Sequence, residues 1–327
     1  MVDSYKKIGM KNCLLKTTIN TMTILKTDLS LFENLVGWDF KENFLSVSSE
    51  FGDLNIHYVD ENSESKDVAL LMHGNPTWGY LYRNMINPLK ESGYRVVVPD
   101  LPGFGKSDKF SIRYNYTYEG FVEWMSQFIE SLDLKNITLF CQDWGGLIGL
   151  RLAAKYGDRF EKIIAANTGL PTGKAPLSEG FAVFREFLQI KSDLHVAGQV
   201  RNGTTKGIDD DALAAYNAPF PSDDHKQGVR QFPNLVPGTL RTPSAEPNKE
   251  AWKILREWNK PFLCAFSDKD PIFAGVENSF YKLVPGCEGM PHVTIKDAGH
   301  FLQEDQPDAC VEAILSIKEI KIVATPQ

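Results

Sequence analysis

Short apolar stretches recur along the chain, and each one ends in small or polar residues. Six of them stand out: 68–72 (VALLM), 95–99 (RVVVP), 137–141 (ITLFC), 163–166 (IIAA), 261–266 (PFLCAF) and 292–295 (HVTI). Their apolar residues are continuous rather than alternating, which is typical of strands buried on both faces of a parallel sheet. The pattern therefore predicts a sheet whose two faces are both covered.

Between these runs the apolar positions recur at helical spacing. Amphipathic helices are predicted for 80–92, 117–132, 146–156 and 305–317. Strands that alternate with helices indicate a doubly wound α/β fold. Residues 45–60 differ, because two alternating runs flank Phe51-Gly52-Asp53, and this predicts an antiparallel hairpin at the start of the sheet.

The strand–helix rhythm breaks in one region, residues 171–249. Proline, glycine and asparagine recur there among short helical patches. We interpret the region as a mainly helical cap, inserted over the carboxyl edge of the sheet. The core then comprises residues 31–170 and 250–327, and residues 1–30 form an N-terminal extension whose purpose the sequence does not reveal. A chain of 327 residues suits this arrangement.

Composition narrows the class of protein. The net charge of -7 argues against nucleic acid or an anionic membrane as the main partner. No apolar run approaches ~18 residues, so no transmembrane helix is expected. The five cysteines are odd in number and form no C-x-x-C motif, which favours free thiols in the reducing cytoplasm and gives no support for a zinc site.

The strongest local motif is CQDWGG at residues 141–146, which follows a predicted strand and opens a predicted helix. α/β-Hydrolases place their nucleophile at such a turn, in the pattern G-x-S-x-G. Here Asp143 occupies the nucleophile position. A carboxylate can displace a leaving group from carbon and form an ester that water then hydrolyses. The alternative is that Asp143 merely caps the helix.

A candidate base follows the last predicted strand. His300 lies in DAGHF, where its neutral imidazole could take a proton from water. A carboxylate must hold its tautomer, and SDKDP offers two: Asp270, which we prefer, and Asp268. The order Asp143, Asp270, His300 is the chain order of α/β-hydrolases.

The loop HGNPTW at residues 73–78 follows the strand at 68–72. The backbone N–H of Asn75 could join that of Trp144 to hold a developing oxyanion. The Asn75 amide and the Trp144 indole are also uncharged donors that would suit a departing halide. The alternatives are a turn residue for Asn75 and packing for Trp144.

With these motifs in place, the sequence resembles the haloalkane dehalogenases from about Leu25 onward, most closely their subfamily with an Asp-His-Asp triad. The resemblance rests on HGNPTWGYLYR, VVPDLPGFGKSD, LFCQDWGGLIGLRLAA, YNAPFP, RQFPNLVP, AFSDKDPI and AGHFLQEDQPD. It implies Asp143 as nucleophile, His300 as base, Asp270 as acid and halide contact by Trp144. It implies no metal and no organic cofactor.

One departure concerns the halide site. Phe184 stands where the resembled subfamily has a second halide-binding tryptophan, and phenylalanine has no N–H to donate. Asn75 matches other dehalogenase subfamilies, so the expected halide-binding pair is Asn75 and Trp144. We expect cap residues, among them Phe181, Phe184, Phe187 and Leu188, to shape the substrate pocket.

The expected reaction turns a small halogenated alkane into alcohol, halide and a proton. An epoxide hydrolase is the main alternative, but that family usually uses two cap tyrosines, and residues 171–249 contain only Tyr216. A fluoroacetate-type dehalogenase would carry arginine where Trp144 stands. A catalytically inactive binding protein and a luciferase-like oxygenase on this scaffold are further alternatives. The sequence leaves the physiological substrate and the oligomeric state open.

Overall fold

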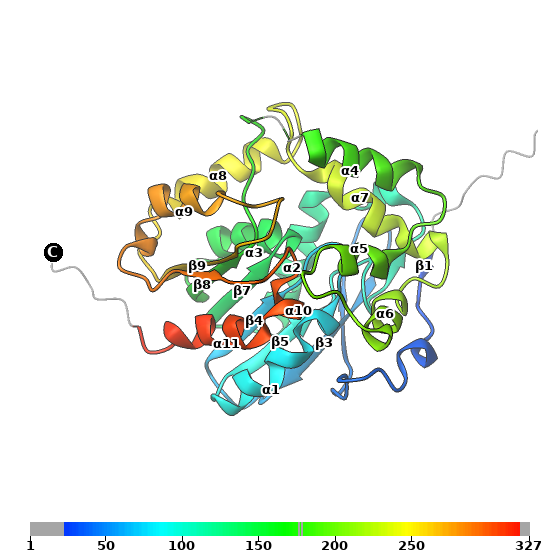
Figure 1. Cartoon of the computed structure of the whole chain (residues 1–327), viewed down its shortest axis with the longest axis horizontal. Helices are drawn as coiled ribbons and strands as arrows, with labels where there is room; N and C mark the ends of the chain where they lie inside the picture. The colour runs from blue at the N-terminus through cyan, green and yellow to red at the C-terminus, as the bar shows by residue number, and fades with distance from the viewer. Residues whose placement is uncertain (1–22, 176, 178, 321–327) are drawn as a thin grey trace, which may run out of the picture.

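An eight-stranded sheet forms the centre of the protein (Figure 1). The structure, a computed structural model, describes residues 23–175, 177 and 179–320. The strand order is β10-β9-β8-β7-β4-β5-β3-β2. The strands are β2 (Asn43–Val47), β3 (Leu54–Glu61), β4 (Val68–Met72), β5 (Arg95–Pro99), β7 (Ile137–Gln142), β8 (Phe160–Ala166), β9 (Phe262–Ser267) and β10 (Val293–Ile295). β3 pairs antiparallel with β2 and β5, and the other pairings are parallel, so the predicted hairpin and the mostly parallel sheet are confirmed.

The continuous apolar runs are explained by burial on both faces of this sheet. In β4, Val68, Leu70 and Met72 belong to one hydrophobic core, whereas Ala69 and Leu71 belong to another. Successive side chains of a strand point to opposite faces, so a strand between two cores must be apolar at every position.

Helices cover both faces of the sheet. One layer contains α2 (Tyr118–Ser131), α3 (Trp144–Lys155) and α8 (Ala245–Leu255), and the other contains α1 (Arg83–Glu91) and α11 (Pro307–Ser316). The helix predicted over 305–317 is present as α11, with a later start. α10 (Leu302–Asp305) ends before Gln306, and α11 starts afresh at Pro307, whose missing N–H cannot continue a helix but suits its first position.

Residues 171–249 contain α4 (Glu179–Ile190), α5 (Val196–Asn202), α6 (Asp210–Asn217) and α7 (Gln227–Leu235). These helices gather at one side of the molecule, where α4 packs on α7 and α5 on α6 (Figure 1). The expected end of the cap, residue 249, falls inside α8, which packs on α3 in the core. Shorter elements are β1 (Ile24–Leu25), β6 (Lys109–Phe110), α9 (Glu277–Leu283), η1 (Leu29–Phe32), η2 (Gly79–Tyr82), η3 (Arg113–Asn115), η4 (Asp223–Lys226) and η5 (Pro285–Cys287).

Most of the expected N-terminal extension, residues 1–22, lies outside the described residues. The segment that begins at Thr23 is attached to the core, because β1 pairs antiparallel with β6. Within the described part of the chain, no helix combines the length and apolar character needed to cross a membrane. The four cysteines described there, Cys141, Cys264, Cys287 and Cys310, are free and buried.

Candidate active site

Asp143 lies on a sharp turn between β7 and α3. Its backbone has φ 51° and ψ -125°, a conformation that a residue with a side chain rarely adopts. The turn is tight because two glycines follow: a Cβ at Gly145 would collide with the Met72 carbonyl oxygen, and one at Gly146 with the Thr168 side chain. The predicted strand–turn–helix context of the motif is therefore present, with the strain typical of a nucleophile elbow.

The Asp143 carboxylate faces the loop that follows β4. Its Oδ1 accepts a hydrogen bond from the backbone N–H of Asn75 at 2.7 Å. Gly74 leaves room for this approach, because a Cβ there would collide with the carboxylate. The Asp143 side chain makes no capping bond to α3, so the helix-cap alternative has no geometric support.

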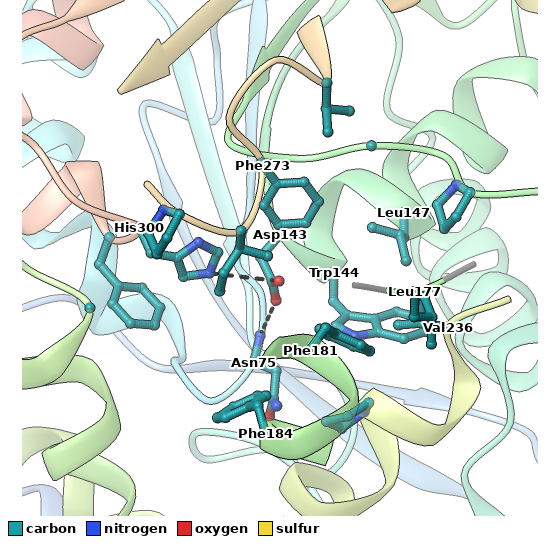
Figure 2. A pocket seen from close by; sticks show the side chains of 18 of the residues that line it. Asn75, Asp143, Trp144, Leu147, Leu177, Phe181, Phe184, Val236, Phe273 and His300 are labelled. Atoms are coloured by element: carbon teal, nitrogen blue, oxygen red, sulfur yellow. Dashed lines mark hydrogen bonds and ion pairs between the residues drawn. The ribbon is translucent and has the colours of Figure 1, made fainter. Parts of the chain in front are cut away.

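Three segments far apart in the chain bring Asp143, His300 and Asp270 together. Figure 2 shows the His300 ring beside the Asp143 carboxylate. His300 Nδ1 lies 3.0 Å from Asp270 Oδ2, and His300 Nε2 lies 3.7 Å from Asp143 Oδ2. Asp270 is buried. Asp268 instead forms an ion pair with Lys269 at 3.5 Å. Of the two carboxylates left open by the sequence, Asp270 is therefore the one that contacts the imidazole.

Gln142 is a part of this site that sequence reasoning missed. Its Nε2 lies 3.1 Å from both Nε2 and the carbonyl oxygen of His300. Because the carbonyl can only accept, the amide nitrogen faces it, and the same nitrogen donates to the ring. Nε2 of His300 is thus an acceptor, and the proton lies on Nδ1, toward Asp270. Gln142 directly precedes Asp143, but no motif marks its role.

Burial and charge shift the pKa values of both central groups. Burial raises the pKa of the Asp143 carboxyl, and His300 and the N–H groups of Trp144 and Asn75 offset this only in part. Burial alone would lower the pKa of His300. The charge and hydrogen bond of Asp270, together with the charge of Asp143, outweigh burial and raise that pKa. The imidazole is therefore a stronger base than a free one, as is common at catalytic sites.

Asp143 and His300 line a cavity of about 760 Å³. Its wall is largely apolar and includes the predicted pocket residues Phe181, Phe184 and Phe187, while Leu188 is packed in the core instead. Asn75 and Trp144 also line it, and Figure 2 shows both beside Asp143. In the described residues no acceptor pairs with the Trp144 indole N–H. This combination suits a small apolar ligand with one polar contact region.

A second feature that the sequence did not reveal ties the cap to the His300 loop. The buried carboxylate of Asp305 accepts hydrogen bonds from the backbone N–H groups of Thr205 (2.9 Å), Lys206 (3.1 Å) and Gly299 (2.8 Å). The N–H of Phe301 donates to the Gly203 carbonyl at 3.2 Å. The backbone on both sides of His300 is thereby fixed to the loop that follows α5.

No trio of histidine, cysteine, aspartate or glutamate is placed to hold a metal ion within the part of the chain that the structure describes. The chemistry available here is that of Asp143, His300 and Asp270, with neutral donors around them. A carboxylate on a strained turn, a base behind it and an apolar cavity in front can support covalent catalysis at carbon.

Comparisons with known proteins point to one family. A family model described as the alpha/beta hydrolase fold matches residues 68–307. The haloalkane dehalogenase of Psychrobacter cryohalolentis is 48% identical over 295 residues, covering 90% of this chain and 97% of that protein. Haloalkane dehalogenase 1 of Mycobacterium tuberculosis is 44% identical over 300 residues, covering 90% and 98%.

A solved structure gives the same result. The haloalkane dehalogenase of Paraglaciecola agarilytica NO2 superposes with a TM-score of 0.85 and 34% identity, covering 91% of this chain and 100% of that one. Fold, sequence identity and near-complete coverage point to the same group of proteins, and the chain belongs to the haloalkane dehalogenases of the α/β-hydrolase fold.

Proposed function

We propose that the protein converts haloalkanes to alcohols through a covalent ester on Asp143. One observation carries the proposal: the Asp143 carboxylate opens onto an apolar cavity while His300 lies behind it at 3.7 Å. Dehalogenase activity follows from family membership. The residue roles, the halide site and the choice among halogenated substrates are our inference from the geometry.

In the first step, one oxygen of Asp143 attacks the carbon that bears the halogen. Oδ1 is held by the N–H of Asn75, so we assign the attack to Oδ2. The new C–O bond forms as the C–halogen bond breaks, and the halide leaves with both electrons of that bond. The Trp144 indole and the Asn75 amide, two uncharged donors that line the cavity, stabilise the departing halide.

In the second step, water attacks the ester carbonyl carbon of Asp143. His300 takes the proton at Nε2, and Asp270 stabilises the resulting imidazolium through Nδ1. The N–H groups of Asn75 and Trp144 hold the oxyanion of the tetrahedral intermediate. Collapse of this intermediate releases the alcohol and restores the carboxylate, and His300 returns its proton to solvent.

An epoxide hydrolase would need an acid to protonate the opening ring oxygen. Tyr216, the tyrosine considered for this role, donates its hydroxyl proton to Glu304 and does not line the cavity. Burial also raises the pKa of Tyr216 well above its ordinary value. The geometry therefore favours the halide reaction over the epoxide reaction.

The test is halide release from a panel of bromo- and chloroalkanes, with styrene oxide run beside them. The wild-type protein is expected to release bromide, and Asp143→Ala to lose this activity on the order of 10⁴-fold or more, because no other group can form the ester. Asp193→Ala, on the exposed surface, is the matched control and should keep it. Diol formation without halide release would overturn the proposal.

Activity is expected to fall as pH decreases through the pKa of His300. The imidazole accepts a proton only when neutral, that is, above its pKa, which lies above the ordinary 6.5. The base acts on the ester, where Asp143 no longer carries its charge, so Asp270 alone opposes burial there. The value of kcat should therefore fall as pH decreases and be retained toward higher pH. Steady-state bromide release from about pH 5 to about pH 9 measures this. A rate that rises on acidification would contradict the assignment of His300 as base.

We also propose that the protein works in the reducing cytoplasm. The support is that Cys141, Cys264, Cys287 and Cys310 are free thiols with buried side chains. Fractionation of the source cells followed by immunodetection tests this, and recovery outside the cytoplasm would overturn it.

A further inference from the structure

Helix α7 carries a proline in its interior, at Pro233. In a regular helix the N–H of each residue bonds to the carbonyl four residues earlier. Proline has no N–H, so Pro233 cannot use the carbonyl of Val229. That carbonyl is therefore left without its ordinary helical donor, at a place where α7 faces the loop after β4.

The side chain of Asn75 donates a hydrogen bond to this carbonyl. Its Nδ2 donates to the Val229 oxygen at 3.4 Å, across 154 residues of sequence. A bond of this length is weak, so its main effect is to select an orientation of the amide. A reversed amide would place its own oxygen against the carbonyl oxygen. The Val229 carbonyl thus fixes the NH₂ end toward α7 and leaves the second N–H free to donate.

Helix α7 also contacts Trp144, the first residue of α3. The Phe232 ring stacks on the Trp144 indole, with centroids 4.4 Å apart and planes inclined by 17°. Phe232 is fully buried and also contacts Phe104 and Phe121, so its ring is held in place. Consecutive residues of α7, Phe232 and Pro233, therefore act on Trp144 and on the carbonyl that Asn75 contacts.

We propose that Pro233 is a positioning residue for halide: by freeing the Val229 carbonyl it orients the Asn75 amide, while Phe232 orients the Trp144 indole. This inference rests on the proposed function, because it assumes that these two donors bind the halide. One cap helix, α7, thereby orients two donors that come from separate core segments: the Asn75 amide from the loop after β4 and the Trp144 indole from α3. The device affects how tightly halide is held, and it leaves the contacts among Asp143, His300 and Asp270 unchanged.

The test restores the missing amide. In Pro233→Ala the new N–H competes for the Val229 carbonyl, so the Asn75 amide loses its orientation. Bromide binding, followed by the saturable quenching of tryptophan fluorescence, is expected to weaken about three- to tenfold, the worth of one neutral hydrogen bond. Pro88→Ala is the matched control, because Pro88 also lies inside a helix, α1, but does not line the cavity. Thermal unfolding of each variant checks that the fold is intact.

A double-mutant cycle separates positioning from simple contact, since Pro233 itself lines the cavity. If Pro233 acts through Asn75, then Pro233→Ala should have no further effect on bromide binding in an Asn75→Ala background. An equal loss in both backgrounds would overturn the inference, as would an unchanged affinity in Pro233→Ala alone. If the wild-type protein releases bromide but shows no saturable bromide binding, the assignment of Asn75 and Trp144 as a halide site is wrong. The assignment of Asp143 as nucleophile is not affected by that result.

Discussion

The His300→Gln variant is expected to release one bromide per protein molecule and then to stop. Attack by Asp143 needs no base, so the ester still forms, whereas its hydrolysis requires a group that takes a proton from water. Glutamine cannot accept that proton. Intact mass measurement should show the alkyl group added to the protein, and peptide mapping should place it on Asp143.

His195→Gln is the control for this experiment, because His195 is an exposed histidine whose ion-pair partner is Asp193. It should turn over at the wild-type rate with no lasting adduct. Steady turnover by His300→Gln would show that another group activates water and would contradict the assignment of His300 as the base. An adduct on a residue other than Asp143 would show that this other residue is the nucleophile.

The Asp270→Asn variant is expected to lose about 10⁴-fold in kcat, by analogy with the loss of the orienting carboxylate in serine proteases. Asparagine can donate to Nδ1 of His300, which would move the ring proton to Nε2 and remove the acceptor for water's proton. It also cannot stabilise the imidazolium. The single-turnover burst of halide should survive, because it precedes the need for the base. Quenched-flow measurement of burst and steady-state rates separates the two steps.

Asp268→Asn is the matched control, since Asp268 lies two residues away and pairs with Lys269 rather than His300. Its kcat should stay near the wild-type value. If the two variants exchanged behaviour, the carboxylate left as the alternative by the sequence would be the acid, and the geometry around His300 would have to change during turnover.

Much of the fold was predictable because burial on both faces leaves a simple pattern. The strands at 68–72 and 95–99 match β4 and β5 residue for residue. The helix predicted over 305–317 matches α11 to within two residues at its start, because apolar spacing does not fix the exact first residue of a helix. α8 was not predicted, since it begins in a stretch assigned to the cap and ends in the core.

The site shows a similar division. Asp143 and His300 were recognisable because each follows a strand in a motif whose chemistry is specific. Asp268 and Asp270 follow the same strand, and the preferred residue, Asp270, is the one that lies 3.0 Å from His300. Gln142 and Asp305 escaped prediction because their roles depend on partners 158 and about 100 residues away, to which no local pattern points.

The wide separation of Gln142 and His300, 158 residues, also has a consequence for protein synthesis. At about 5–20 residues per second, roughly 10–30 s pass between translation of the nucleophile's segment and that of its base. During that interval the nascent chain carries the nucleophile's segment without the histidine that completes the site. β10, the strand that leads to His300, is also the edge strand that joins β9, so the catalytic base arrives with one of the last pieces of the sheet to be made.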